Sequence, residues 1–204
     1  LTGPRQSGKT TLVQKIFPKK SYVSLEDIDM REFAERDPRG FLANYPKGAI
    51  FDEIQRVPGL FSYIQGIVDR KKVPGQFVLT GSQNFLLHER ITQSLAGRVA
   101  LITLLPLSIE EVRNSGVLAG DYSKYLFTGL YPRLYESSVE SRAWYANYVS
   151  TYIERDVRQI KNIMDLGAFQ LFLKMCAGRT GQLLNLSSLA NDCGITHNTA
   201  KAWL

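Results

Sequence analysis

Short apolar runs alternate with amphipathic stretches through the first half of this 204-residue chain. The runs at 21–25, 49–53, 76–80 and 99–104 predict β-strands. Between them, apolar residues at helical spacing predict helices at 8–17, 26–36, 59–72 and 85–95. Strands that alternate with helices are typical of a parallel sheet covered on both faces. We therefore predict an α/β fold, a three-layer sandwich with a parallel sheet, for residues 1–105.

The pattern becomes wholly helical after Pro106. Ser108 and Glu111 have the spacing of a capping box and predict a helix start. Further helices are expected at 122–127 and 141–163, with a turn at 129–133 between them. We interpret the many tyrosines of this region chiefly as half-buried packing residues. Residues 106–165 are therefore predicted to form an all-α lid.

The last forty residues have the pattern of a helix-turn-helix unit. Helices are expected at 167–178, at 186–193 and from 196 onward, with small Ala190 at the helix contact and Gly194 at the turn. We predict a partial winged helix over 166–204. Polar side chains that face outward on its third helix could contact DNA, and they are Thr196, His197, Asn198 and Lys201. A three-helix module used for packing or protein contact is the alternative interpretation.

Composition narrows the class of protein only modestly. The net charge of +6 permits an anionic partner such as nucleic acid without requiring one. No apolar run approaches the roughly 18–20 residues that cross a bilayer, so no membrane partner is expected. Cys176 and Cys193 fit neither a disulfide framework nor a zinc site, which favours a reducing, cytoplasmic compartment. His88 and His197 are too isolated to indicate a metal site or a catalytic base.

The most informative motif is a glycine-rich loop near the start of the chain. It has the spacing glycine, four residues, then Gly-Lys-Thr, which is typical of a phosphate-binding loop. The two glycines allow consecutive N–H groups to turn inward around phosphate oxygens. Lys9 would place a charge on the β- and γ-phosphates, and Thr10 would ligate Mg²⁺. The predicted nucleotide-binding residues are Gly3, Pro4, Arg5, Gln6, Ser7, Gly8, Lys9, Thr10 and Thr11.

A pair of acids, Asp52 and Glu53, ends the apolar strand at 49–53. In parallel sheets, ligands bind and reactions take place at the carboxyl-terminal ends of the strands, which is where this acid pair lies. Asp52 would hold Mg²⁺, and Glu53 would polarise the water that attacks the γ-phosphate. An exposed acidic turn is the alternative, and we would favour it if no phosphate loop lay upstream.

A polar turn, Gly81 to Asn84, follows the neighbouring strand at 76–80. Ser82, Gln83 and Asn84 are each candidates for a sensor of the γ-phosphate, and a simple turn with a helix cap is the alternative. Arg98 opens the strand at 99–104, far from bound phosphate, so we expect either a subunit interface or a plain surface arginine. Arg155 lies in a charged patch. The patch is either a solvated helix face, or one of its arginines reaches the nucleotide from the lid.

Both ends of the chain interrupt predicted elements. Only Leu1 and Thr2 precede the loop, although a buried strand normally leads into it, and Leu204 falls inside a predicted helix. We therefore expect a fragment of a longer protein that lacks most of its first strand.

The chain as a whole resembles the prokaryotic predicted ATPases of the AAA+ superfamily that carry a C-terminal domain of unknown function. The segments that carry the resemblance are 3–11, 24–27, 50–58, 79–83, 94–98 and 105–108. The resemblance implies ATP binding, slow hydrolysis and a nucleotide-driven change between the core and the helical part. It also implies a P-loop NTPase fold for the core.

These observations predict an ATP-binding protein with Mg²⁺-dependent ATP hydrolysis. Its expected catalytic residues are Lys9, Glu53, Gln83 and Asn84, and its metal-binding residues are Thr10 and Asp52. We expect the nucleotide state to control how the C-terminal helices engage DNA, a protein partner or a second copy. Three alternatives stay open: an ATP-binding switch with negligible turnover, a small-molecule kinase, and a DNA-binding regulator.

Overall fold

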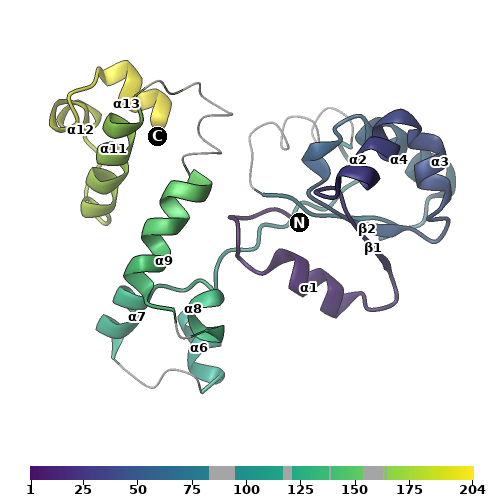
Figure 1. Cartoon of the computed structure of the whole chain (residues 1–204), viewed down its shortest axis with the longest axis horizontal. Helices are drawn as coiled ribbons and strands as arrows, with labels where there is room; N and C mark the ends of the chain where they lie inside the picture. The colour runs from purple at the N-terminus through teal and green to yellow at the C-terminus, as the bar shows by residue number, and fades with distance from the viewer. Residues whose placement is uncertain (83–94, 117–120, 138, 154–162, 164) are drawn as a thin grey trace. The chain divides into compact units, whose positions relative to one another are not determined.

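The computed structural model describes residues 1–82, 95–116, 121–137, 139–153, 163 and 165–204. These residues divide into two compact units, Leu1–Val139 and Glu140–Leu204. Each unit has its own apolar core, and Figure 1 labels most of the helices and strands of both. The helix expected at 85–95 lies almost entirely outside the described residues. The division into 1–105, 106–165 and 166–204 stays a prediction.

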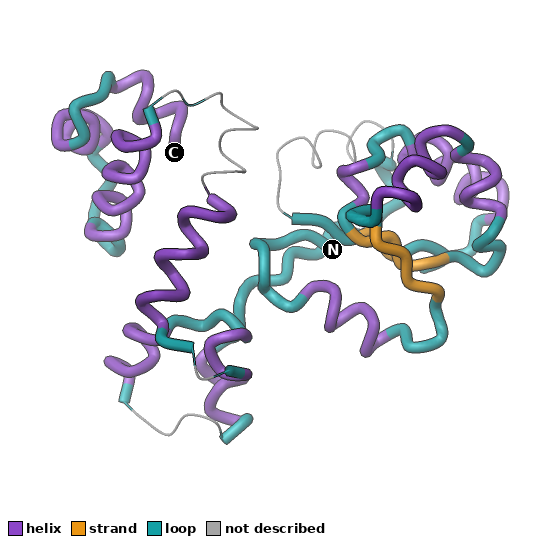
Figure 2. The backbone as a smooth tube through the Cα atoms, in the orientation of Figure 1, coloured by secondary structure: helices purple, strands orange, loops and turns teal. Residues whose placement is uncertain are grey.

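Three parallel strands form the sheet of the first unit (Figure 2). They are β1 (Ser21–Ser24), β2 (Ala49–Asp52) and β3 (Val78–Leu79), in the order β1-β2-β3. The register pairs Ser24 with Asp52 and Phe51 with Leu79. Every residue of the central strand β2 is buried, as expected for a strand covered on both faces. The predicted α/β character and parallel sheet are confirmed, although each strand is shorter than its apolar run.

The sheet continues beyond β3 through two short segments. The backbone N–H of Gly81 donates to Leu1, and the terminal amine of Leu1 donates to the carbonyl of Leu79. Thr2 in turn pairs in parallel with Thr103. The segment that leads into the glycine-rich loop therefore lies between β3 and residues 102–104.

The strand predicted at 99–104 is wrong in extent. It makes a single bridge, at Thr103, with two backbone hydrogen bonds of 2.7 and 2.8 Å around it. A regular ladder needs a run of paired residues on both strands, and among the described residues only Thr2 pairs with this segment.

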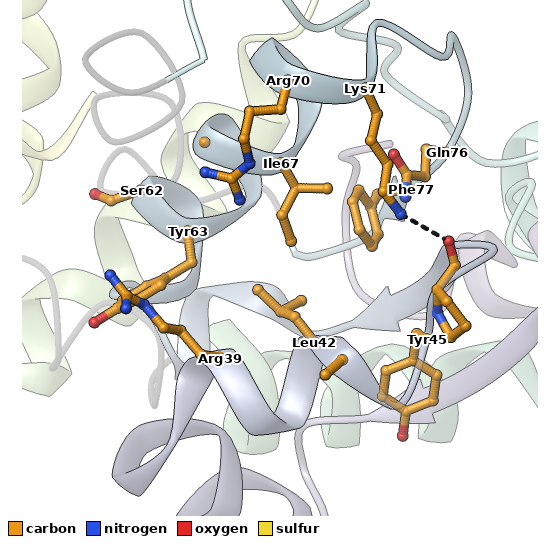
Figure 3. A pocket seen from close by; sticks show the side chains of 13 residues that line it. Arg39, Leu42, Tyr45, Ser62, Tyr63, Ile67, Arg70, Lys71, Gln76 and Phe77 are labelled. Atoms are coloured by element: carbon orange, nitrogen blue, oxygen red, sulfur yellow. Dashed lines mark hydrogen bonds between the residues drawn. The ribbon is translucent and has the colours of Figure 1, made fainter.

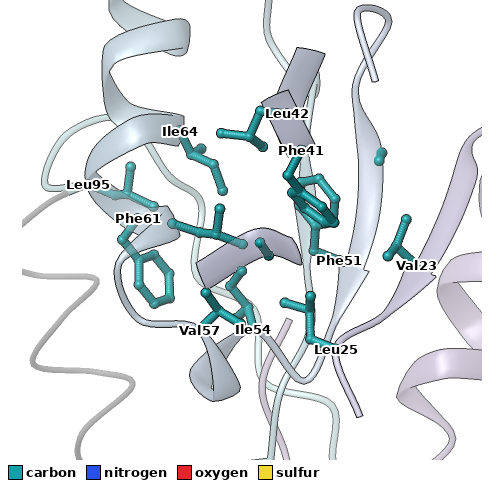
Figure 4. Packing of buried hydrophobic residues seen from close by; sticks show 13 residues of the cluster. Val23, Leu25, Phe41, Leu42, Phe51, Ile54, Val57, Phe61, Ile64 and Leu95 are labelled. Atoms are coloured by element: carbon teal, nitrogen blue, oxygen red, sulfur yellow. The ribbon is translucent and has the colours of Figure 1, made fainter. Parts of the chain in front are cut away.

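Helices cover both faces of this sheet (Figure 1). Helix α1 (Lys9–Ile16) lies on one face, and α2 (Ile28–Arg36), α3 (Pro38–Ala43) and α4 (Leu60–Lys71) lie on the other. The main core lies under α3 and α4, where Phe41, Phe51 and Ile64 are almost fully buried (Figure 4). Burying each such side chain contributes about 1.5–3 kcal/mol. This packing fixes β2, and with it the strand end that carries the acid pair.

After residue 107, the regular elements that the structure describes in the first unit are all helices. Helix α6 (Ile109–Asn114) begins with the predicted capping box, because Ser108 and Glu111 each accept the other's backbone N–H. Helix α7 (Tyr122–Thr128) ends at Gly129, and the predicted turn then passes into a short helix, α8 (Arg133–Glu136). Most of the described tyrosines of this region are half-buried, as interpreted: Tyr131, Tyr135, Tyr145 and Tyr148. Tyr125 is buried, and Tyr122 departs from the interpretation because it is 67% exposed.

The second unit contains only helices in its described residues. It starts with α9 (Ser141–Tyr148) and one π-helical segment, η2 (Val149–Ile153), so the continuous α-helix predicted from residue 141 changes its winding at 149. Three further helices follow, α11 (Leu166–Gly178), α12 (Leu186–Asp192) and α13 (His197–Trp203). Trp203 packs edge-on against Phe169 and Phe172, with ring centroids 5.2 and 5.5 Å away. The three predicted C-terminal helices are confirmed, and a wing is not among the described elements.

The length and apolar character of the helices decide whether one of them could cross a membrane. Across the described residues, no helix is both long enough and apolar enough to span a bilayer.

Candidate functional site

The glycine-rich loop turns sharply between the sheet and helix α1. Gly3 has a φ of 149° and Gly8 a φ of 91°, values that residues with a β-carbon rarely adopt. A β-carbon on Gly3 would also lie 2.1 Å from the carbonyl oxygen of Leu104, so the neighbouring segment leaves room for glycine alone. Helix α1 begins directly after Gly8. The loop therefore ends at the N-terminus of a helix, where free N–H groups favour an anion.

Lys9 folds back over its own loop. Its side chain is buried to 6% exposure, and Nζ donates to the carbonyl oxygens of Gly3 at 3.1 Å and Pro4 at 2.7 Å. Burial lowers the pKa of Lys9, while the negative charges of Glu53 and Asp52 act in the opposite direction. The ammonium group is thus held by two neutral acceptors that a phosphate oxygen could replace.

Ser7 provides the test of whether this loop suits a phosphate. The residue is buried, and its hydroxyl has no hydrogen-bond partner within the described residues. A buried hydroxyl that lacks a partner destabilises a fold by roughly 1–3 kcal/mol. A bound phosphate oxygen would supply that partner. The Ser7 hydroxyl, the turned backbone of the loop and the Lys9 ammonium together fit a phosphate group.

Asp52 is the point where the loop and the sheet meet. It ends β2 at 7% exposure, and one of its oxygens accepts hydrogen bonds from the hydroxyls of Thr10 at 2.7 Å and Tyr22 at 2.8 Å. Its other oxygen accepts from the hydroxyl of Thr80 and from the backbone N–H of Glu53. The Thr10 hydroxyl and the Asp52 carboxylate are both oxygen ligands of the kind Mg²⁺ prefers. These two residues therefore fit a magnesium site.

Glu53 leaves the strand in an unusual backbone conformation. Its φ of 56° and ψ of 44° lie in the left-handed region, directly before the short helix η1 (Ile54–Arg56). Burial raises the pKa of Glu53, the positive charge of Arg5 opposes that rise, and the negative charge of Asp52 adds to it. A raised pKa suits a carboxylate that accepts a proton during a reaction.

An amide connects Glu53 to the polar turn after β3. The Nε2 atom of Gln55 donates to the Glu53 carboxylate and also lies 3.2 Å from the hydroxyl of Ser82. Ser82 is thus the one predicted sensor candidate that the structure describes, and it lies beside the acid pair. Gln83 and Asn84 fall outside the described residues, so their predicted roles stay predictions.

Other predicted residues lie away from this cluster or outside the described part. Arg98 is partly exposed and pairs with Asp69 of helix α4, which favours the surface-arginine interpretation. Arg155 falls outside the described residues. In the second unit, Thr196 caps α13, while His197, Asn198 and Lys201 lie exposed along it.

Sequence reasoning missed Tyr22, Thr80 and Gln55. The alternation of β1 contains a signal for Tyr22, because the register pairs Ser24 with Asp52 and places Tyr22 on the same face two residues earlier. Thr80 closes the neighbouring strand at the same edge of the sheet. No sequence pattern points to Gln55, since its position depends on the turn that Glu53 makes.

The chain matches known proteins along its whole length. Residues 1–113 match the family described as the AAA domain. Residues 119–204 match a domain of unknown function. Uncharacterized proteins of Mycobacterium bovis and Mycobacterium tuberculosis are each 34% identical to this chain over 208 residues, an alignment that covers 100% of the chain and 46% of each relative. The chain thus spans about half the length of these relatives.

The AAA match covers more than half of the 204 residues. It contains the glycine-rich loop, the acid pair and the parallel sheet, and it indicates a nucleotide-binding domain of the ATPase type. The chain belongs to the AAA domain family.

Proposed function

We propose that this chain binds ATP with Mg²⁺ and hydrolyses it. One observation carries the proposal: the Thr10 hydroxyl donates to the Asp52 carboxylate across 42 residues of sequence. Because of that contact, the N-terminus of α1, which suits a phosphate, lies next to Asp52 and Glu53. Those two acids suit a metal ion and a general base. The AAA domain match also supports a nucleotide-binding domain of the ATPase type.

Each residue of the cluster receives a role in this proposal. The phosphates bind the loop from Gly3 to Thr11, and Lys9 exchanges its two carbonyl contacts for phosphate oxygens. Thr10 and Asp52 hold Mg²⁺, which when bound supplies charge neutralisation on the phosphates. The sensor role falls to Ser82, Gln83 or Asn84.

The hydrolytic step uses Glu53 as general base. The carboxylate accepts a proton from a water molecule while the water oxygen bonds to the γ-phosphorus. The bond from that phosphorus to the bridging oxygen breaks, and ADP and inorganic phosphate leave. Lys9 stabilises the negative charge that develops on the departing oxygens.

We further propose that the nucleotide state governs how the C-terminal helices engage DNA or a protein partner. The exposed polar side chains His197, Asn198 and Lys201 on α13 support this part. Helices α12 and α13 would be the first and second helices of a helix-turn-helix unit. In such units, residues at the start of the second helix contact the base edges of DNA. A duplex-DNA titration with and without ATP tests the coupling, and equal affinities in both conditions would oppose it.

A second candidate function is an ATP-binding switch with negligible turnover. It is favoured by the hydrogen bond that already engages Glu53 with Gln55. Measuring ATP affinity alongside turnover separates the two candidates. Hydrolysis predicts that Glu53→Gln retains ATP binding and loses turnover, whereas the switch predicts that both quantities match those of the unsubstituted protein.

A further inference from the structure

A groove of about 860 Å³ opens in the first unit between helices α3 and α4 (Figure 3). It also borders residues 45–46 and 76–77, which precede strands β2 and β3. The groove thus lies at the amino-terminal edge of the sheet, and the phosphate loop lies at the opposite, carboxyl-terminal edge. We call it the basic groove, and the lining residues used below are Arg39, Tyr45, Tyr63, Arg70, Lys71 and Gln76.

Positive charge dominates the basic groove. Arg39, Arg70 and Lys71 line it, and none of the described residues that line it is acidic. Among the described residues, no carboxylate forms an ion pair with Arg39 or Arg70, and both are exposed. Lys71 donates to the carbonyl of Pro46 at 3.1 Å, a neutral partner that leaves its charge in place. The groove therefore presents three cations to an anionic ligand.

Aromatic rings lie among these cations. Tyr63 is 39% exposed, so part of its ring is open to a ligand. The rings of Tyr45 and Phe77 both pack against the buried ring of Phe51, and their centroids lie 5.6 and 5.8 Å from the Phe51 centroid. Gln76 is buried, and its Oε1 has no hydrogen-bond partner within the described residues, which leaves an acceptor for a ligand N–H. Cations together with open aromatic faces are the combination that binds single-stranded nucleic acid.

We propose that the basic groove binds single-stranded nucleic acid, with phosphates on Arg39 and Arg70 and a base stacked on Tyr63. An acidic peptide would use the cations but would leave the aromatic ring and the amide acceptor without a role. The inference goes beyond the proposed function, because it needs neither ATP nor the C-terminal helices. Its failure would leave ATP hydrolysis untouched.

The test is fluorescence anisotropy of a labelled twelve-nucleotide oligo-dT with the full protein at several salt concentrations. The double variant Arg39→Gln/Arg70→Gln should weaken binding at least tenfold. It should also reduce the slope of log affinity against log salt by about 1.4, since each phosphate contact on a single strand contributes about 0.7. Tyr63→Ala should weaken binding about tenfold, and Tyr63→Phe should restore it.

The matched control is Lys15→Gln/Lys19→Gln, which removes the same two charges from exposed positions in and just after α1, on the other face of the sheet. It should leave the affinity within twofold of the unsubstituted protein. Circular dichroism verifies that every variant is folded. Equal weakening by both double variants, or no oligo-dT binding by the unsubstituted protein, would overturn the proposal. Tighter binding of a labelled oligo-glutamate peptide, lost in Arg39→Gln/Arg70→Gln, would assign the groove to acidic peptides instead.

Discussion

At the scale of single residues, the site is organised by the Asp52 carboxylate. Three hydroxyls donate to it: that of Thr10 in α1, that of Tyr22 in β1 and that of Thr80, the residue after β3. Hydrogen bonds to a charged group are stronger than those between neutral groups. The carboxylate therefore holds the loop, the edge strand and the neighbouring strand in one arrangement.

Tyr22→Phe tests this arrangement. The substitution keeps the ring and removes only the hydroxyl 2.8 Å from Asp52. Because Tyr22 is partly exposed, we expect the free energy of unfolding to fall by about 1 kcal/mol, measured by urea denaturation. Tyr63→Phe, which removes a hydroxyl from a tyrosine of nearly the same exposure, is the control and should change stability by less than about 0.5 kcal/mol. Equal effects of the two substitutions would show that the Tyr22 contact contributes nothing.

Glu53 predicts the pH dependence of hydrolysis. Burial raises its pKa above the ordinary value of 4.5, and a general base works only when deprotonated. ATPase activity should therefore decline as pH falls through this raised pKa, at a pH above 4.5. Glu26 contributes to the rise through its negative charge, so Glu26→Gln should move the acid limb to lower pH. The measurement is kcat against pH for both proteins, and a limb at or below pH 4.5 would contradict the role of Glu53.

The sequence predicted the residues whose chemistry follows from a motif, and it did not predict those placed by tertiary structure. Lys9, Thr10 and Asp52 follow from spacing and strand position alone. Gln55 reaches Glu53 and Ser82 only because Glu53 adopts a left-handed conformation, which no local pattern signals. Tyr22 was identifiable in principle, but only once the register of β1 against β2 was known.

At the scale of elements, glycines set how closely the strands approach one another. Gly48 precedes β2 with a φ of 86°, and a β-carbon there would lie 1.7 Å from the carbonyl oxygen of Gln76. The amino-terminal ends of β2 and β3 can pair only because this position has no side chain. The central strand depends on that pairing, and so does the acid pair at its other end.

Gly48→Ala should lower the free energy of unfolding by more than about 2 kcal/mol. Gly59→Ala is the matched control, because no atom lies within 4 Å of a β-carbon built there and its φ is −59°. We expect that change to stay within about 0.5 kcal/mol. Denaturant unfolding of both variants makes the comparison, and similar losses would contradict the close approach of the strands.

The C-terminal helices depend on an aromatic core. Phe172 is almost fully buried against Trp203, so Phe172→Ala should destabilise this unit by about 3–5 kcal/mol. Leu183 is 97% exposed, and Leu183→Ala should be neutral. Tryptophan fluorescence during thermal unfolding follows the change, and an unchanged melting temperature for Phe172→Ala would argue against the helical core.

Helices and strands formed as predicted where the spacing of apolar residues was clear. The prediction failed where a neighbouring strand determined whether a segment could pair. Helices α11, α12 and α13 and strand β2 carry strong apolar patterns, and they form close to where these patterns indicate. The apolar run at 99–104 makes only one bridge, because a strand is defined by its neighbour as well as by its sequence.

At the scale of the whole molecule, the chain combines an AAA domain with a second, helical part that matches a domain of unknown function. The proposed ATP site lies entirely within the first unit, and the exposed face of α13 lies in the second. A role for ATP in controlling the second unit therefore requires energetic coupling between two units that each have their own apolar core.

ATP hydrolysis is the central claim, and one measurement tests it most directly. Release of inorganic phosphate from ATP is followed for the full protein with Mg²⁺, beside Lys9→Ala and a Lys15→Ala control from the exposed side of α1. We predict Mg²⁺-dependent turnover that falls about a hundredfold in Lys9→Ala and is unchanged in Lys15→Ala. Turnover that is absent from the unsubstituted protein, or equal in all three proteins, would contradict the assignment.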